Sequence, residues 1–229
     1  MKNILEAIEN CDIDKLNKEL KQVNAGELNM FKINNQESLL HYAIKFCGKE
    51  VIKSLITGGM NINIVNSDGY SILELLALYN DKGSIEYCIN LGAKILNNEG
   101  YTLIHWCATH NEVNILKKLL ETNENIDIDM KDFLSDGEKD CTALHWAAQE
   151  GNIPIARVLF EKGADINAKN ASGQTALIIS AAEGNKDFVK FLLDLGADIN
   201  IKDNDKNKAK DFALIYGYLE VALLLEKQK

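Results

Sequence analysis

Apolar residues recur along the chain in short segments that have the period of an α-helix. In the segment 153–162, the residues spaced i, i+3 and i+4 are Ile155, Val158 and Leu159. This spacing is typical of the buried stripe of an amphipathic helix. The preceding segment, 143–150, places small and apolar residues on one face, namely Leu144, Ala147 and Ala148. The pattern therefore predicts a pair of short helices, the first of which can approach a neighbour closely.

This helix pair recurs in phase 33 residues later along the chain. The stretch TALHWAAQEGNIPIARVLFEKGADINAKN begins at Thr142, and TALIISAAEGNKDFVKFLLDLGADINIKD begins at Thr175. A fixed period of this size predicts a stack of similar two-helix units, none of which can bury its own apolar faces alone. Pro154, the single proline of the chain, falls where the second helix begins, a position at which its missing N–H costs nothing.

The repeated motif T-A-L-H-W-A-A…G…L…G-A-D-I-N resembles the ankyrin repeat, whose usual form is T-P-L-H-x-A-A…G…L-L…G-A-D…N. With His145 as phase marker, the equivalent positions are Leu5, His41, Glu74, His105, His145, Ile178 and Asp211. A hydroxyl residue that can cap the first helix precedes five of these markers, as Ser38, Ser71, Thr102, Thr142 and Thr175. The inter-helix turn six residues after each marker is Cys11, Cys47, Asn80, Asn111, Gly151, Gly184 and Gly217.

The resemblance implies an all-α solenoid of stacked helix-turn-helix pairs with β-turn or hairpin finger loops. We expect a single ankyrin-repeat domain over 1–229, with seven approximate repeats at 1–35, 36–66, 67–97, 98–137, 138–170, 171–203 and 204–229. The first and last repeats are expected to be caps with a polar outer side, since LEAIENCDIDKLNKEL and YLEVALLLEKQK are both amphipathic and charged. Two capped ends favour a complete protein.

Composition narrows the class of partner and the compartment. The chain of 229 residues has a formal net charge of −9 and no basic run, so nucleic acid is not an expected partner. No stretch approaches eighteen apolar residues, and the N-terminus carries acids where a signal peptide has its apolar core. We therefore expect a cytoplasmic protein without membrane insertion. The five cysteines are scattered singly, which favours reduced thiols over a disulfide framework.

Candidate chemistry is sparse. Three of the four histidines are phase markers, and the resemblance implies that they hydrogen-bond loop backbone rather than bind metal. Stacked repeats also place equivalent residues about 10 Å apart, too far for shared zinc ligation. The acidic run Asp127, Asp129, Asp132 and Asp136 lacks the glycine and closing glutamate of a calcium loop. We expect no cofactor, no metal and no enzyme; the competing class is a metal-dependent activity that uses His105, His110 and Cys107.

The resemblance implies that a partner binds the concave side, which is built from finger loops and exposed first-helix residues. Repeats two to four place large side chains at these positions, namely Phe46, Tyr70, Leu78, Tyr79, Tyr101 and His110. They are typical of an interface core, although large residues can also fill space between irregular helices. The finger 129–140 is seven residues longer than its counterpart and adds Phe133 and Leu134, either as binding residues or in a solvated loop.

The predicted function is a monomeric, non-catalytic protein–protein interaction scaffold or adaptor. An effector or an assembly chaperone built from the same repeat is the alternative.

Overall fold

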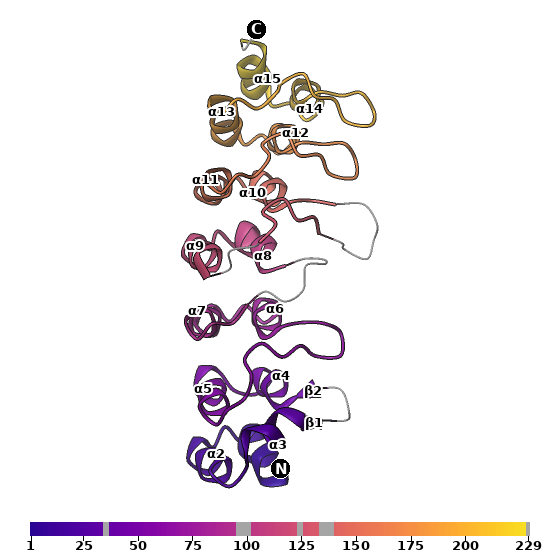
Figure 1. Ribbon diagram of the computed structural model, residues 1–229. Coiled ribbons are helices and arrows are strands. Elements are labelled where there is room, and N and C mark those ends of the chain that lie inside the picture. The colour runs from indigo at the N-terminus through magenta and orange to yellow at the C-terminus, as the bar shows by residue number, and fades with distance from the viewer. Residues whose placement is uncertain (34–36, 95–101, 123–125, 133–139, 228–229) are drawn as a thin grey trace. The chain divides into compact units, whose positions relative to one another are not determined.

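A computed structural model (Figure 1) describes residues 1–33, 37–94, 102–122, 126–132 and 140–227. The chain divides into two compact units, Met1–Asn97 and Asn98–Lys229. We call them unit 1 and unit 2 and describe each by itself. The expectation of one continuous domain with seven repeats stays a prediction.

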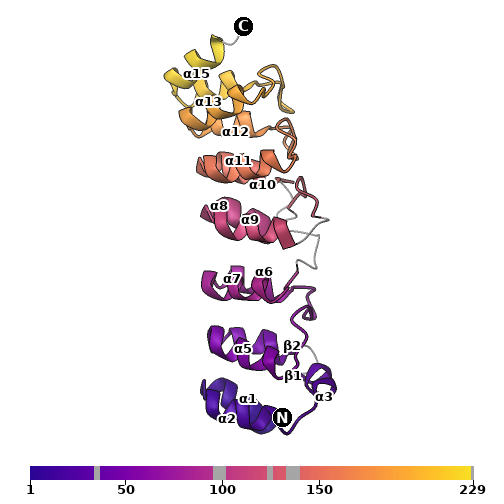
Figure 2. The same cartoon turned by 60° about the vertical axis from the view of Figure 1, so that its left-hand side comes forward.

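Unit 1 consists of paired helices with one small hairpin. Its elements are α1 (Lys2–Glu9), α2 (Ile13–Leu20), α3 (Ala25–Met30), β1 (Lys32–Ile33), β2 (Glu37–Ser38), α4 (Leu39–Ile44), α5 (Lys49–Thr57), α6 (Ile72–Leu78) and α7 (Lys82–Asn90). Helix α4 contacts α1 and α6, while α5 contacts α2 and α7, so first helices pack on first helices and second helices on second helices (Figure 2). Strands β1 and β2 are antiparallel, with Lys32 opposite Ser38.

Unit 2 repeats the arrangement with four helix pairs in its described residues. They are α8 (Leu103–His110) with α9 (Val113–Thr122), α10 (Ala143–Glu150) with α11 (Ile153–Glu161), α12 (Ala176–Ala182) with α13 (Lys186–Asp194), and α14 (Ala209–Ile215) with α15 (Leu219–Glu226). Helix α10 packs between α8 and α12, and α12 packs between α10 and α14. The predicted helices 143–150 and 153–162 agree with α10 and α11, and the predicted all-α class is confirmed. Helix α3 was not anticipated.

The hydroxyl residues that precede the first helices act as caps. The Ser38 hydroxyl accepts a hydrogen bond from the His41 amide at 3.3 Å. At Thr142 the cap is reciprocal, because its hydroxyl accepts from the backbone of the third helical residue while its own amide donates to His145 Nδ1 at 3.0 Å. These bonds satisfy amides that the helix itself leaves without partners. The hydroxyl residue therefore caps the first helix, as the sequence predicts, although the proline of the usual T-P-L-H motif is absent.

Neighbouring finger loops are joined by side chains that accept from the next loop. In unit 1 the Asn61 amide donates to Asn29 Oδ1 at 2.7 Å, and the Lys94 amide donates to Asn63 Oδ1 at 2.8 Å. In unit 2 the Asp198 amide donates to Asn167 Oδ1 at 2.9 Å. In these three cases a repeat supplies an acceptor for a backbone group of its neighbour, so the contact between repeats helps to hold the loops.

Candidate partner-binding face

Four large side chains of unit 1 are exposed at the predicted positions. The exposed fractions are 47% for Phe46, 37% for Tyr70, 66% for Leu78 and 54% for Tyr79. We call these four residues the aromatic face. Successive helical residues turn by about 100°, so burial of Leu76 and Ala77 in α6 carries the next two side chains out of the packed side. Phe46 holds the equivalent position after α4, which packs on α6.

Phe46 lies beside a second ring and a polar rim. The rings of Tyr42 and Phe46 have centroids 4.7 Å apart, and the Tyr42 hydroxyl donates to Glu9 Oε1 at 2.7 Å. This hydrogen bond to a carboxylate raises the pKa of Tyr42. Lys45 next to Phe46 forms an ion pair with Glu37 at 2.9 Å. The polar groups of Tyr42 and Lys45, close to Phe46 along the chain, therefore already have partners.

Tyr70 projects from a finger turn that is fixed by Asn66. The Asn66 side-chain oxygen accepts from the amides of Asp68 at 3.0 Å and Tyr70 at 2.8 Å, and the Asn66 amide donates to the Tyr70 carbonyl at 3.0 Å. Gly69 completes the turn with φ at +83°, a left-handed conformation that glycine adopts without a steric penalty. The backbone of Tyr70 is thus held in place while its ring remains exposed.

The other predicted site residues are not brought onto this face by the described structure. His110 belongs to unit 2, where its exposed ring stacks on Trp106 at 4.8 Å and Nδ1 lies 3.1 Å from the Trp106 carbonyl oxygen. Tyr101, Phe133 and Leu134 lie outside the described residues. The prediction that all eight residues bind one partner therefore stays untested, and only the unit 1 residues can be placed together.

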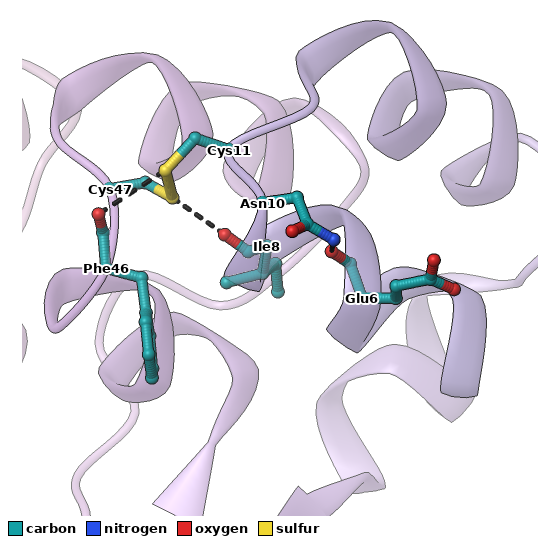
Figure 3. Close-up of a disulfide and its surroundings, with 6 residues drawn as sticks. All are labelled: Glu6, Ile8, Asn10, Cys11, Phe46 and Cys47. Atoms are coloured by element: carbon teal, nitrogen blue, oxygen red, sulfur yellow. Dashed lines mark hydrogen bonds between the residues drawn. A yellow bond between two sulfur atoms is a disulfide. The ribbon is translucent and has the colours of Figure 1, made fainter.

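A disulfide joins Cys11 to Cys47, with their Cα atoms 5.7 Å apart (Figure 3). The prediction of five reduced thiols is therefore wrong for this pair, and one of the arguments for a cytoplasmic location falls with it. Cys88, Cys107 and Cys141 are buried thiols. The cysteines of the pair occupy the same inter-helix turn in consecutive repeats, so the stack itself brings them together. The equivalent positions of Cys11 and Cys47 in consecutive repeats could have predicted the disulfide from the sequence. The absence of closely spaced cysteine pairs does not exclude it.

The bridge lies next to the backbone of Phe46, one residue of the aromatic face. Cys11 Sγ is 3.3 Å from the carbonyl oxygen of Phe46, and Cys47 Sγ is 2.7 Å from that of Ile8 (Figure 3). In the dithiol these approaches are donated hydrogen bonds; in the disulfide they are close polar contacts, because oxidised sulfur carries no proton. The position of Phe46 is therefore tied by its own backbone and by its neighbour Cys47 to the turn of the first helix pair.

Two of the three phase-marker histidines, His105 and His145, have structural partners at both ring nitrogens. His105 Nδ1 accepts from the Thr102 amide at 3.1 Å, and Nε2 is 3.0 Å from the Met130 carbonyl oxygen. His145 repeats this pattern, with Nε2 3.0 Å from the Gln174 carbonyl oxygen. Both arrangements require the neutral ring with its proton on Nε2. Desolvation accordingly lowers the pKa of His145 to about 4.

Two of the three residues of the metal-dependent alternative, His105 and Cys107, are buried. Both ring nitrogens of His105 face backbone partners, and burial raises the pKa of the Cys107 thiol, which disfavours the thiolate that binds metal. Within the described residues, no group of three or more His, Cys, Asp or Glu side chains could hold a metal ion.

The acidic run has a structural explanation in part. Asp132 is completely buried, and it accepts from the Cys141 amide at 2.7 Å and from the Trp146 indole at 2.8 Å. Asp129 accepts from the Asp165 amide at 3.0 Å. These carboxylates bind protein donors rather than forming a loop around a cation. Asp136 lies outside the described residues.

Across the described parts of the chain, the helices are too short or too polar to cross a membrane.

Comparison with known proteins agrees with this architecture. A family model described as ankyrin repeats (3 copies) matches residues 40–132, 80–170 and 167–229. An ankyrin repeat protein of Rickettsia bellii is 29% identical over 176 residues, which cover 76% of this chain and 24% of that protein.

Two shorter matches come from fungi. Palmitoyltransferase akr1 of Schizosaccharomyces pombe is 42% identical over 65 residues, or 28% of this chain and 9% of that protein. Transcription factor MBP1 of Saccharomyces cerevisiae is 51% identical over 37 residues, or 16% and 4%. The chain thus spans a quarter or less of each relative, and the similarity concerns the repeats. On the evidence of the family model and of its paired, capped helices, the chain belongs to the ankyrin repeat family.

Proposed function

We propose that this chain is a non-catalytic scaffold that binds a protein partner on the exposed first-helix and finger residues of repeats two to four. The single observation that carries the proposal is the aromatic face of unit 1. Ankyrin repeats are in general protein–protein interaction modules, and the predicted role gives these exposed side chains a use. Aromatic residues in such a position supply large apolar contact area at a low cost in side-chain entropy.

The contrast with the regular repeats supports this assignment. At the positions of Leu78 and Tyr79, helix pair α10/α11 has Gln149 and Glu150, and pair α12/α13 has Ala182 and Glu183. The same backbone geometry thus accepts small or polar residues without loss of the fold. Large apolar side chains at those positions in unit 1 are therefore not required by helix packing, and four of them together form an apolar surface of the kind found at binding sites.

The geometry favours a partner that spans from finger to turn. Tyr70 lies before the start of α6 and Tyr79 directly after its end, so the seven residues of α6, roughly 10 Å of helix, lie between them. A partner that contacts both ends of α6 would bind Tyr70 and Tyr79, and Phe46 on the neighbouring repeat would be a third contact. A folded surface or an extended segment can meet this requirement.

The test is affinity capture from lysate of the native organism with the chain of 229 residues and a Tyr70→Ser, Tyr79→Ser variant. We expect capture to fall at least tenfold, because an aromatic anchor at the centre of an interface contributes about 2 kcal/mol or more. The matched control is Tyr87→Ser, which removes a tyrosine of the second helix in the same unit. Tyr87 belongs to α7, where its ring centroid lies 5.1 Å from Lys49 Nζ.

Capture that is equal for the variant and the wild type, with helical circular dichroism intact in both, would refute the binding face. A loss that is equal in Tyr87→Ser would also refute it, because the effect would then not be specific to the first-helix side.

A further inference from the structure

The turn at Cys47 differs in its backbone from the other inter-helix turns, all of which lie within the described parts of the chain. The other turn residues have a positive φ, and the amide after each of them donates to the carbonyl five residues before it. These turn residues are Cys11, Asn80, Asn111, Gly151, Gly184 and Gly217. We call this arrangement the common turn. At Cys47 the φ is not positive, and the carbonyl of Ala43, which Gly48 would reach in the common turn, instead accepts from the amide of Cys47 at 3.0 Å.

The same difference affects the backbone of Phe46, a residue of the aromatic face. The Phe46 amide donates to the Ala43 carbonyl, three residues back, at 3.2 Å. At the equivalent position of the next repeat, the Tyr79 amide donates to the Leu75 carbonyl, four residues back, at 3.0 Å. Helix α4 accordingly ends at Ile44, one position earlier in its repeat than α6. The direction in which the Phe46 ring leaves the backbone therefore depends on the conformation of this turn.

The residue types at the second turn do not explain its conformation. Cys11 is also a cysteine and adopts the common turn with φ at +52°, and Gly48 is free to adopt any φ. Packed helices place equivalent residues about 8–10 Å apart, whereas a disulfide requires Cα atoms within about 7 Å. The Cα atoms of Cys11 and Cys47 are 5.7 Å apart. Since the first turn keeps the common conformation, the second turn is the one that departs from it to form the bridge.

The bridge also replaces a hydrogen bond that the regular repeats make between neighbouring turns. In unit 2 the Asn152 side chain donates to the Ala108 carbonyl at 2.7 Å, and an asparagine makes the same contact one repeat later. The residue at this position in the second repeat is Gly48, which has no side chain. The equivalent acceptor is the Ile8 carbonyl, and it lies 2.7 Å from Cys47 Sγ (Figure 3). The contact between these two turns thus depends on the oxidation state of a cysteine pair.

We propose that the Cys11–Cys47 bridge is a redox switch of the aromatic face. Reduction returns residues 46–48 to the common turn and moves Phe46, so the oxidised chain binds the partner and the reduced chain binds it more weakly. The effect on binding rests on the proposed function, whereas the change of the turn does not.

The reaction requires a dithiol as reductant. One of its thiolates attacks the sulfur of Cys11, because Cys11 is exposed whereas Cys47 is 8% exposed. The bond between the two cysteines breaks, a mixed disulfide forms at Cys11, and the sulfur of Cys47 leaves as a thiolate and takes up a proton. The second thiolate of the reductant then attacks the mixed disulfide and releases Cys11, which is protonated in turn. Two electrons pass from the dithiol to the bridge, so the chain gains two thiols and the reductant becomes a disulfide.

Amide hydrogen exchange of the chain of 229 residues, followed by nuclear magnetic resonance before and after addition of dithiothreitol, tests the change of the turn. We expect exchange at Gly48 to slow at least about tenfold on reduction, because its amide then donates to the Ala43 carbonyl. Asp81 is the internal control, since it holds the equivalent position in the same unit and donates to Leu76 at 3.0 Å. Unchanged exchange at Gly48 would overturn the proposal. Loss of protection at Asp81 would also do so, because reduction would then unfold unit 1 rather than reset one turn.

The effect on binding is measured with the variant Cys11→Ser, Cys47→Ser and the oxidised wild type, both without reductant. The readout is retention of the captured protein whose binding depends on Tyr70 and Tyr79. We expect retention to fall at least about threefold in the double-serine variant. The matched control is Cys88→Ser, which removes a buried thiol of the same unit and should retain the partner.

Two outcomes separate this inference from the proposed function. Equal retention by the double-serine variant and the wild type would overturn the switch and leave the proposed function in place. If no captured protein depends on Tyr70 and Tyr79, the proposed function fails and the effect on binding fails with it, while the exchange at Gly48 still decides the change of the turn.

Discussion

Reduction of the Cys11–Cys47 bridge is expected to destabilise unit 1 and to spare unit 2. The bridge closes a loop of 36 residues that contains α2, α3, the strands β1 and β2, and α4. In the chain-entropy description, closing such a loop lowers the entropy of the unfolded chain by about 13 cal/mol/K. At 25 °C this corresponds to about 4 kcal/mol of stability. Since small proteins lose about 2 kcal/mol per molar urea, the unfolding midpoint of unit 1 should fall by about 2 M.

The chain offers a direct way to separate the two units in one experiment. Trp106 and Trp146, its two tryptophans, both belong to unit 2. Tryptophan fluorescence in urea therefore follows unit 2, whereas far-ultraviolet circular dichroism follows the helices of both units. We expect a dithiol reductant to move part of the circular dichroism transition to lower urea and to change the fluorescence transition little.

The control is the double variant Cys11→Ser, Cys47→Ser, which should unfold like the reduced wild type and should not respond to reductant. Circular dichroism curves that superimpose with and without reductant would refute the stabilising role of the bridge. A shift with reductant that persists in the double-serine variant would show that another group is responsible.

The backbone at Cys11 adds a finer expectation to the same experiment. Its φ is +52°, in the left-handed region, at a turn where Gly151 and Gly184 have φ of +71° and +72°. A side chain in this conformation costs about 1 kcal/mol relative to glycine. Against a Cys47→Ser background, Cys11→Gly should therefore be more stable than Cys11→Ser by about that amount.

Three further predictions concern the rest of the chain. Between pH 6.5 and about pH 4, His145 binds a proton in the unfolded state but stays neutral in the folded state. The contribution of His145 to the free energy of unfolding is therefore present above pH 6.5 and falls by up to about 3 kcal/mol towards pH 4. Urea midpoints at pH 7 and pH 5 measure this loss. Gly59→Ala should destabilise more than Gly92→Ala, because both have positive φ but only the first adds a Cβ against Ala25, 2.7 Å away; equal thermal midpoints would contradict it. In hydrogen exchange, repeats five and six (138–203) should be the most protected, and uniform protection would be contrary evidence.

Much of the fold could be predicted from the sequence because the same motif occurs twice, at Thr142 and at Thr175. The second copy of the motif fixes which residues are equivalent, and equivalence carries the helix bounds, the caps and the turns from one repeat to the next. Helix α10 begins and ends where Thr142 and Gly151 predict. The markers also predicted that Phe46, Leu78 and Tyr79 turn away from the packed side, and their exposed fractions agree with this.

Contacts that depend on the distances between turns, and the exposure of single side chains, could not be predicted. Helix-packing distance suggests that equivalent side chains in neighbouring repeats are too far apart to react, yet the turns at Cys11 and Cys47 approach to 5.7 Å between Cα atoms. Likewise, YLEVALLLEKQK contains enough charge to suggest a polar cap, but Leu219 and Leu223 of α15 are exposed. Composition does not distinguish these arrangements; the placement of each side chain does.

The central claim is that a partner binds the aromatic face of unit 1. The most direct measurement is the amount of captured partner retained by Tyr79→Ser relative to Tyr87→Ser, quantified by mass spectrometry from the same lysate. Both variants lose one tyrosine from the same unit, one from the end of a first helix and one from a second helix. The account predicts that Tyr87→Ser retains the partner and that Tyr79→Ser loses at least nine-tenths of it, as expected for an anchor that contributes about 1.4 kcal/mol or more. Equal retention by the two variants would contradict it.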